Sequence, residues 1–206
     1  MRSSEDFSHS LLHLNCNSLL KHNINKQERK AGISTSLYKM ISSHRIVRLV
    51  DTRLNDEKQR KLEETFSKKF HIISTKNNNI SRAGVIIIIQ KQVTDEIIHV
   101  HLEKPDPNDG HRIGAVVYKD KILGQTAIIM TVYVPPNKNK AISLNKTFNI
   151  LYKLKEKYRT DCVLMGTDAN IRLDEYNRKT AREIQELLEI NQLVDSYSNI
   201  EQSTQT

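Results

Sequence analysis

The sequence has no tryptophan, few cysteines and no long apolar run, and each shortage excludes a class of protein. Its two cysteines, Cys16 and Cys162, are too few for a disulfide-stabilised secreted scaffold or a zinc site. The longest aliphatic run, residues 85–89, is far shorter than the roughly 20 residues that span a bilayer. Residues 1–10 are polar and lack the apolar centre of a signal peptide. We therefore expect an intracellular protein without a membrane partner, in which both cysteines are buried reduced thiols.

The charge is strongly basic for a chain of this size. Among 206 residues, 32 Lys and Arg stand against 24 Asp and Glu, which gives a net charge of +8. Such an excess fits a polyanionic partner, usually nucleic acid. The excess does not require such a partner, because many basic proteins bind no polyanion and biased codon usage also enriches lysine.

Strand-like and helix-like segments alternate along the chain. We expect residues 1–10 to be a polar N-terminal segment and residues 11–206 to form one domain. Predicted strands cover 11–16, 45–50, 71–74, 84–90, 97–102, 113–118, 126–134 and 162–165, with the start of another at 192–197. Predicted helices cover 33–43, 56–68, 142–158 and 179–190. Residues 113–118 and 126–134 should form an antiparallel hairpin. The order predicts a layered α/β fold with mixed sheets inside and helices outside.

The most informative segment is residues 163–170, VLMGTDAN. An apolar strand runs into Asp168, and Asn170 follows two positions later, so an extended backbone would point both side chains to one face. A carboxylate can deprotonate a water, and an amide can hold that water or a phosphate oxygen. Asp beside Asn is also common in plain turns, so this motif alone favours a turn.

Polar residues recur at the ends of other predicted strands. The first strand ends in Asn15 and Asn17, the second in Asp51, and the hairpin in Tyr133. Oxygen ligands of this kind suit Mg²⁺, which keeps several waters and prefers phosphate oxygens. Taken singly, each of these residues is more often a strand-end or helix cap, or a half-buried sheet residue, than a functional residue. Together, and in this order, they favour a catalytic site.

Six short motifs carry a resemblance to a known superfamily. They are LNCN at 14–17, VDTRL at 50–54, AGVII at 83–87, YVP at 133–135, GTDAN at 166–170 and LVDSY at 193–197. Their order resembles the endonuclease/exonuclease/phosphatase superfamily, and within it the apurinic/apyrimidinic-type endonuclease domain of LINE-type (non-LTR) retrotransposons. The resemblance covers about residues 11–197. It implies a sandwich of two mixed β-sheets flanked by helices.

The resemblance also implies a reaction and a set of roles. Such enzymes hydrolyse a DNA phosphodiester by in-line attack and leave a 3′-hydroxyl, which primes reverse transcription in retroelements. Asn15 and Asp51 would hold Mg²⁺, or Mn²⁺ in its place, with Asn17 nearby. The resemblance implies the other roles by position. Tyr133 would contact the scissile phosphate, and Asp168 would orient and deprotonate the attacking water. Asn170 would bind the phosphate or that water.

Basic residues near these motifs are candidates for binding the DNA backbone. Arg53 lies in the second motif, and Lys138 and Lys140 follow the YVP motif. Each phosphate that they neutralise would add salt dependence to binding. An ordinary charged loop is the alternative. A nuclear location follows if the substrate is target DNA.

Two departures from the superfamily pattern bear on activity. The metal-site carboxylate is usually Glu, and Asp51 has one methylene fewer, which shortens its reach by roughly 1.5 Å. The superfamily closes with a Ser-Asp-His element, but no His follows His111 and no Asp follows Asp195. We therefore expect a domain truncated at its C-terminus, with an exposed sheet edge. Two alternatives stay open: a nucleic-acid-binding remnant without turnover, or a repair nuclease or phosphatase of the same fold.

Overall fold

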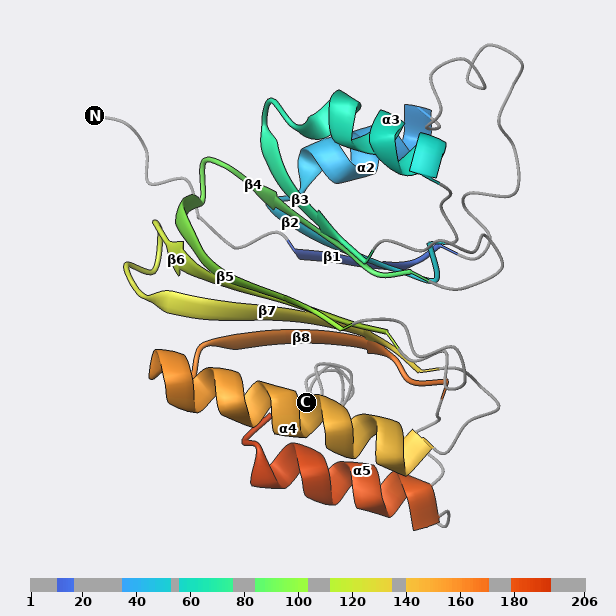
Figure 1. Ribbon diagram of the computed structural model, residues 1–206, viewed down its shortest axis with the longest axis vertical. Helices are drawn as coiled ribbons and strands as arrows, with labels where there is room; N and C mark the ends of the chain where they lie inside the picture. Colours follow the sequence, from blue (N-terminus) through green and yellow to red (C-terminus); the bar gives the residue numbers. More distant parts are fainter. Residues whose placement is uncertain are drawn as a thin grey trace, which may run out of the picture.

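The protein is built from two β-sheets packed face to face, with helices on both outer faces (Figure 1). The computed structural model describes residues 11–16, 35–52, 56–75, 84–103, 112–134, 140–170 and 179–193. Within them, helices α2 and α3 cover one sheet and helices α4 and α5 cover the other. The predicted layered α/β fold with two mixed sheets is confirmed.

The first sheet has the strand order β1-β2-β4-β3, with β1 and β2 parallel and the other pairs antiparallel. Its strands are β1 (Leu11–Asn15), β2 (Ile46–Val50), β3 (Phe70–Ser74) and β4 (Ile86–Gln90). Both faces of β4 are buried, because Ile86 and Ile88 belong to the core under the helices while Ile87 and Ile89 belong to the core between the sheets. A continuous aliphatic run is therefore what this strand requires.

The second sheet has the order β5-β6-β7-β8, and only β7 and β8 run parallel. Its strands are β5 (Thr94–Leu102), β6 (Arg112–Asp120), β7 (Thr126–Tyr133) and β8 (Val163–Asp168). The predicted hairpin is the antiparallel β6–β7 pair. Asp120 closes its turn, since one carboxylate oxygen accepts the N–H groups of Ile122 and Leu123 at 2.7 and 2.9 Å.

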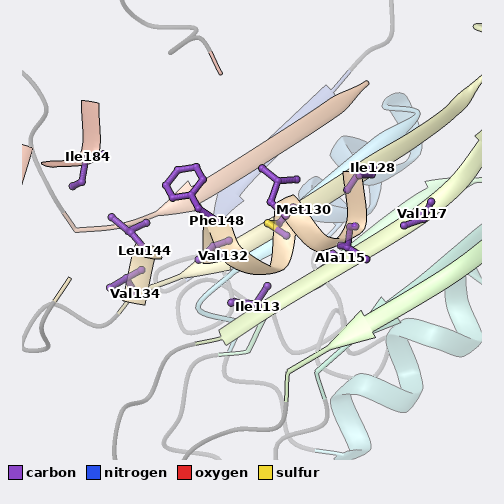
Figure 2. Packing of buried hydrophobic residues seen from close by; sticks show 12 residues of the cluster. Ile113, Ala115, Val117, Ile128, Met130, Val132, Val134, Leu144, Phe148 and Ile184 are labelled. Atoms are coloured by element: carbon purple, nitrogen blue, oxygen red, sulfur yellow. The ribbon is translucent and has the colours of Figure 1, made fainter. Parts of the chain in front are cut away.

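Helices α4 (Lys140–Tyr158) and α5 (Lys179–Ile190) cover the outer face of the second sheet. The apolar side of α4 repeats at helical spacing, and its core residues are Leu144, Phe148, Leu151 and Leu154. They pack on alternate residues of β6 and β7, with Ile184 of α5 beside them (Figure 2): Ile113, Ala115, Val117, Ile128, Met130 and Val132. This packing fixes where α4 begins, next to the end of β8.

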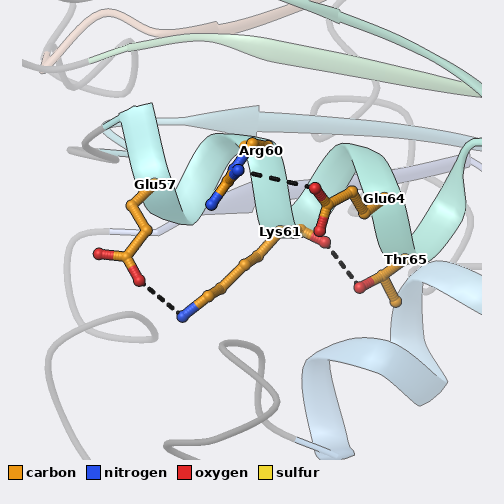
Figure 3. A network of polar contacts seen from close by, with 5 residues as sticks. All are labelled: Glu57, Arg60, Lys61, Glu64 and Thr65. Carbon is orange, nitrogen blue, oxygen red and sulfur yellow. Dashed lines mark hydrogen bonds and ion pairs between the residues drawn. The ribbon is translucent and has the colours of Figure 1, made fainter.

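Helices α2 (Thr35–Ser43) and α3 (Asp56–Phe66) cover the first sheet. Helix α3 begins with Asp56 and Glu57, which favour the positive end of the helix dipole. Its outer face carries a Glu57–Lys61 ion pair at 2.8 Å and an Arg60–Glu64 contact at 3.8 Å (Figure 3). These pairs are solvated, so the helix depends mainly on its buried side.

The predicted elements that fall on described residues are all present, with ends shifted by a few residues. The largest shifts are at β5, which begins at Thr94 and pairs irregularly with β6, and at β8, which ends at Asp168 rather than at Met165. Residues 194–197 lie outside the described residues, and Leu193 is not in a strand. Both cysteines are free thiols as predicted, but only Cys16 is fully buried. No helix in the described ranges is long and apolar enough to cross a membrane.

Candidate active site

The two parallel strand pairs collect the predicted site residues at their carboxyl ends. Asn15 at the end of β1 lies in register with Val50 of β2, directly before Asp51. On the other sheet, Tyr133 at the end of β7 lies in register with Asp168 at the end of β8. Parallel strands end at a common edge, so each sheet supplies one half of a site.

A hydrogen bond joins these two halves. Asn15 Nδ2 donates to Asp168 Oδ2 at 2.5 Å, across 153 positions of sequence. Because Asn15 belongs to the first sheet and Asp168 to the second, this bond spans the sandwich. Bonds to an ionised acceptor are short and strong, and this one fixes the orientation of the carboxylate.

Asp51 lies just beyond β2 and is 2% exposed. Its backbone has φ of 50°, a left-handed conformation that Asp and Asn tolerate better than branched residues. The next residue, Thr52, donates its N–H to the carbonyl of Gly84 at 3.1 Å. A Cβ on Gly84 would lie 2.7 Å from Thr52 Oγ1, so the glycine of the AGVII motif lets the Asp51 turn approach.

The pKa of Asp168 depends on its surroundings, including Asp51. Burial raises the pKa of Asp168 above its ordinary value, the negative charge of Asp51 raises it further, and the backbone N–H of Asn170 opposes the shift by hydrogen bonding to it. Asp51 also acts on Cys16, whose thiol pKa is raised to about 12, mainly by burial. The thiol is therefore protonated and unreactive at neutral pH.

The chemistry of this donor set fits a hard divalent cation. Two neighbouring carboxylates repel each other, and a cation between them would remove that repulsion. Among the described residues, no group of three His, Cys, Asp or Glu side chains could hold a metal ion. Mg²⁺ commonly binds through one or two carboxylates, with water and substrate oxygens completing its shell.

Asn170 ties the end of β8 to its neighbours. Its φ of 50° breaks the strand alternation after Asp168. Its side-chain Nδ2 donates to the carbonyl of Val134 at 2.8 Å, and its own carbonyl accepts a hydrogen bond from Lys140 Nζ. Asn170 therefore makes the contacts of a strand-end turn while lying beside Asp168.

Tyr133 and Lys140 border the site on different sides. Tyr133 is 8% exposed and packs with Val50 and Val85, so its ring lies between the sheets next to Asp168. Lys140 is the first residue of α4, and its bond to Asn170 places its ammonium at the rim. Three predicted site residues lie outside the described residues: Asn17, Arg53 and Lys138.

The interior behind the site contains polar residues that sequence reasoning missed. Arg48 is 5% exposed and Arg112 is 1% exposed, and Thr131 is fully buried. All five residues of β2 are buried, including Arg48. The sequence does contain one indication that Arg48 is buried. Aliphatic residues lie on both sides of it, and such a run is typical of a strand covered on both faces.

Comparisons with known proteins identify the fold. No protein-family profile matches the chain, and no curated protein matches its sequence. Solved structures do match. D. rerio TDP2 complexed with a single-strand DNA product is 14% identical, with a TM-score of 0.55 over 79% of this chain and 61% of that one. An endonuclease/exonuclease/phosphatase family protein from Bacteroides thetaiotaomicron is 11% identical, with a TM-score of 0.56 over 85% and 66%.

A third match is the mannosyl-6-phosphatase Bt3783 of Bacteroides thetaiotaomicron, at 11% identity and a TM-score of 0.56 over 85% of this chain and 69% of that one. The chain thus spans about three fifths of the TDP2 structure and two thirds of the two bacterial ones. At these identities the similarity concerns the backbone arrangement. The chain has the endonuclease/exonuclease/phosphatase fold.

Proposed function

We propose that this chain is a Mg²⁺-dependent endonuclease domain that nicks DNA for a LINE-type retrotransposon. The observation that carries the proposal is the Asn15–Asp168 hydrogen bond beside Asp51, which joins a candidate metal ligand to a candidate base. The net charge of +8 supports a nucleic-acid substrate, as does the DNA bound to a protein of the same fold. The six sequence motifs support the retrotransposon branch.

Asp168 is the residue that would take the proton from the attacking water. Its pKa lies above the ordinary value, mainly because it is buried, so its carboxylate is a stronger base than an exposed one. Asn15 donates a hydrogen bond to one carboxylate oxygen of Asp168 and so holds the base in place. A Mg²⁺ ion held by Asn15 and Asp51, with Mn²⁺ as a substitute, would stabilise charge on the phosphate and the leaving oxygen.

DNA would lie across the carboxyl ends of the strands. Lys140 is at the rim and can approach a phosphate, while Arg53 and Lys138 are assigned to the backbone by sequence alone. Tyr133 would contact the scissile phosphate, Asn170 would hold the phosphate or the water, and Asn17 would lie near the metal. Charge contacts of this kind make binding weaken steeply with salt. A nuclear location accompanies this proposal, because the target is chromosomal DNA.

Nicking of supercoiled plasmid by the purified chain tests the proposal. We expect Mg²⁺-dependent nicking that EDTA abolishes and that falls by about 100-fold to 10,000-fold in Asp168→Ala and Asp168→Asn. Asp161→Asn is a matched control, because Asp161 is exposed and pairs with Lys155 rather than with the site. Equal nicking by the wild type and both Asp168 variants would refute the role of Asp168.

The same preparation separates the alternatives. A folded chain that binds DNA in a salt-sensitive way without nicking it would be a nucleic-acid-binding remnant. Turnover of a phosphomonoester such as p-nitrophenyl phosphate, without nicking, would favour a phosphatase, the activity named for Bt3783.

A further inference from the structure

We propose that Arg48 is a positioning residue, which sets the spacing between the two halves of the site by packing against Gly166. The proposal rests on the function proposed above, because it assigns Arg48 a part in that reaction. Arg48 belongs to β2, three residues before Asp51, and Gly166 belongs to β8, two residues before Asp168. Their contact lies one pleat, about 7 Å, behind the carboxylate of Asp168.

The described strands of the two halves do not pair with each other, because they belong to different sheets. Asn15 and Asp51 follow strands of one sheet, and Tyr133 and Asp168 end strands of the other. The side chains that fill the space between the sheets therefore determine the distance between the halves. Any residue that changes this filling near the strand ends should move one half relative to the other.

Arg48 lies directly against the backbone of Gly166. A Cβ placed on Gly166 would be 2.5 Å from Cζ, 2.6 Å from Nη1 and 2.8 Å from Nε of Arg48. No side chain fits there unless the guanidinium or the strand moves. Arg48 is 5% exposed and so has little room to retreat. The planar guanidinium of Arg48 on one sheet thus occupies the space that a side chain at position 166 would need on the other sheet.

The layer around this contact differs from the rest of the inter-sheet core. His13 lies in register with Arg48, and Thr131 lies in register with Gly166. Nε and Nη1 of Arg48, Nδ1 of His13 and Oγ1 of Thr131 have no hydrogen-bond partner among the described residues. An aliphatic side chain would be easier to bury than a guanidinium. The rigid, planar guanidinium of Arg48 fits against the Cα of Gly166, which has no side chain. This contact sets the distance between the two sheets.

A double-mutant cycle with Gly166→Ala, Arg48→Met and the double variant tests the positioning role. For each protein, kcat and KM for plasmid nicking, the Mg²⁺ requirement and the unfolding free energy in urea would be measured. We expect Gly166→Ala to lower kcat on the order of 100-fold, because a displacement of about 1 Å at a reacting group has that effect. KM for DNA should change little. Arg48→Met should restore about tenfold of the loss in the Gly166→Ala background, since its thin chain can move aside.

Ile129→Val is the matched control. Ile129 lies in the same space on β7 but further from the strand ends, in register with Leu164. It should reduce stability without changing kcat or the Mg²⁺ requirement. If Gly166→Ala does not fold, Arg48→Met alone and the double variant carry the test, because neither brings the added methyl group of Gly166→Ala against a guanidinium.

Each outcome decides the proposal. Folded Gly166→Ala and Arg48→Met variants that keep the wild-type kcat, as Ile129→Val does, would refute the positioning role and leave the proposed function intact. A wild-type chain that does not nick would refute the proposed function, and with it any part of Arg48 in that reaction. Non-additive unfolding free energies would then still establish the contact, so the two failures are distinguishable.

Discussion

The two ends of the inter-sheet space are built from the same strands but differ in chemistry. At one end most inward side chains are aliphatic, among them Ile46, Ile89, Ile129 and Leu164, and the buried Tyr118–Asp120 hydrogen bond is a polar exception. Toward the carboxyl ends of β1, β2 and β8, polar side chains are more frequent: His13, Arg48, Asn15 and Asp168. We expect stability to come mainly from the first end, because burying polar groups at the second end is unfavourable.

The largest effect expected at the apolar end is that of Ile129→Ala. Ile129 is fully buried between the sheets, and its truncation should lower the unfolding free energy by about 2 to 5 kcal/mol through lost burial and the cavity left behind. Urea denaturation followed by circular dichroism measures this loss. The Mg²⁺ dependence of nicking should not change. A loss below about 1 kcal/mol would mean that the apolar end is not the main source of stability.

At the polar end, Gly84→Ala should have a smaller effect on stability and a specific effect on the metal. Its Cβ would lie 2.7 Å from Thr52 Oγ1, beside Asp51. We expect a loss of about 1 to 3 kcal/mol from overpacking, together with a raised Mg²⁺ requirement. Introducing Thr52→Ala removes the colliding atom and should reduce both effects. Full effects of Gly84→Ala in the Thr52→Ala background would show that this close approach is not the cause.

Sequence reasoning found the elements and the strand ends because both leave local signals. The continuous aliphatic run of β4 and the helical spacing of Leu144, Phe148 and Leu151 mark buried segments directly. Polar residues at strand ends marked Asn15 and Asp168, and the packing of one sheet on the other brings these two residues together. Which strands pair in parallel depends on contacts between residues far apart in the chain, and local pattern does not encode this.

Arg48 illustrates what local pattern misses. An arginine in a strand is ordinarily a surface residue, because burying its charge is unfavourable. Its burial depends on Gly166, which lies 118 positions away in sequence and leaves space on the opposite sheet. Similarly, the left-handed backbone of Asn170 redirects its side chain to Val134, whereas simple alternation had placed it with Asp168. Both features require the tertiary structure.

The polar end should also make stability depend on pH through His13. Burial, and then the positive charge of Arg48, lower the pKa of His13 from 6.5 to about 4. The unfolded chain therefore binds a proton near pH 6.5, whereas the folded chain resists it until about pH 4. The stabilisation is present above pH 6.5 and is lost as the pH falls toward 4. Between pH 7 and pH 5 the loss should be roughly 2 kcal/mol.

Urea unfolding at pH 7 and pH 5 measures this dependence against a His13→Gln variant. His71 and His99 also have lowered pKa values because of burial, so the wild type contains their contributions too. The difference between wild type and variant isolates His13. Equal pH dependence in the two proteins would mean that His13 is as solvated in the folded chain as in the unfolded one.

The smallest effect belongs outside both ends, on the solvated face of α3. Lys61→Ala removes an ion pair with Glu57 that measures 2.8 Å, but the Glu57 side chain is 62% exposed and water competes for both charges. The pair should contribute about 0.5 kcal/mol or less, and the higher helix propensity of alanine offsets part of that. The Thr65 bond to the Lys61 carbonyl is unaffected, since it involves only backbone at Lys61. Urea unfolding at low and high salt should therefore give nearly equal values for wild type and variant. If Lys61→Ala lowered the unfolding free energy by more than about 1 kcal/mol, the surface of α3 would contribute substantially to stability. The contrast between the two ends of the core would then explain less of it.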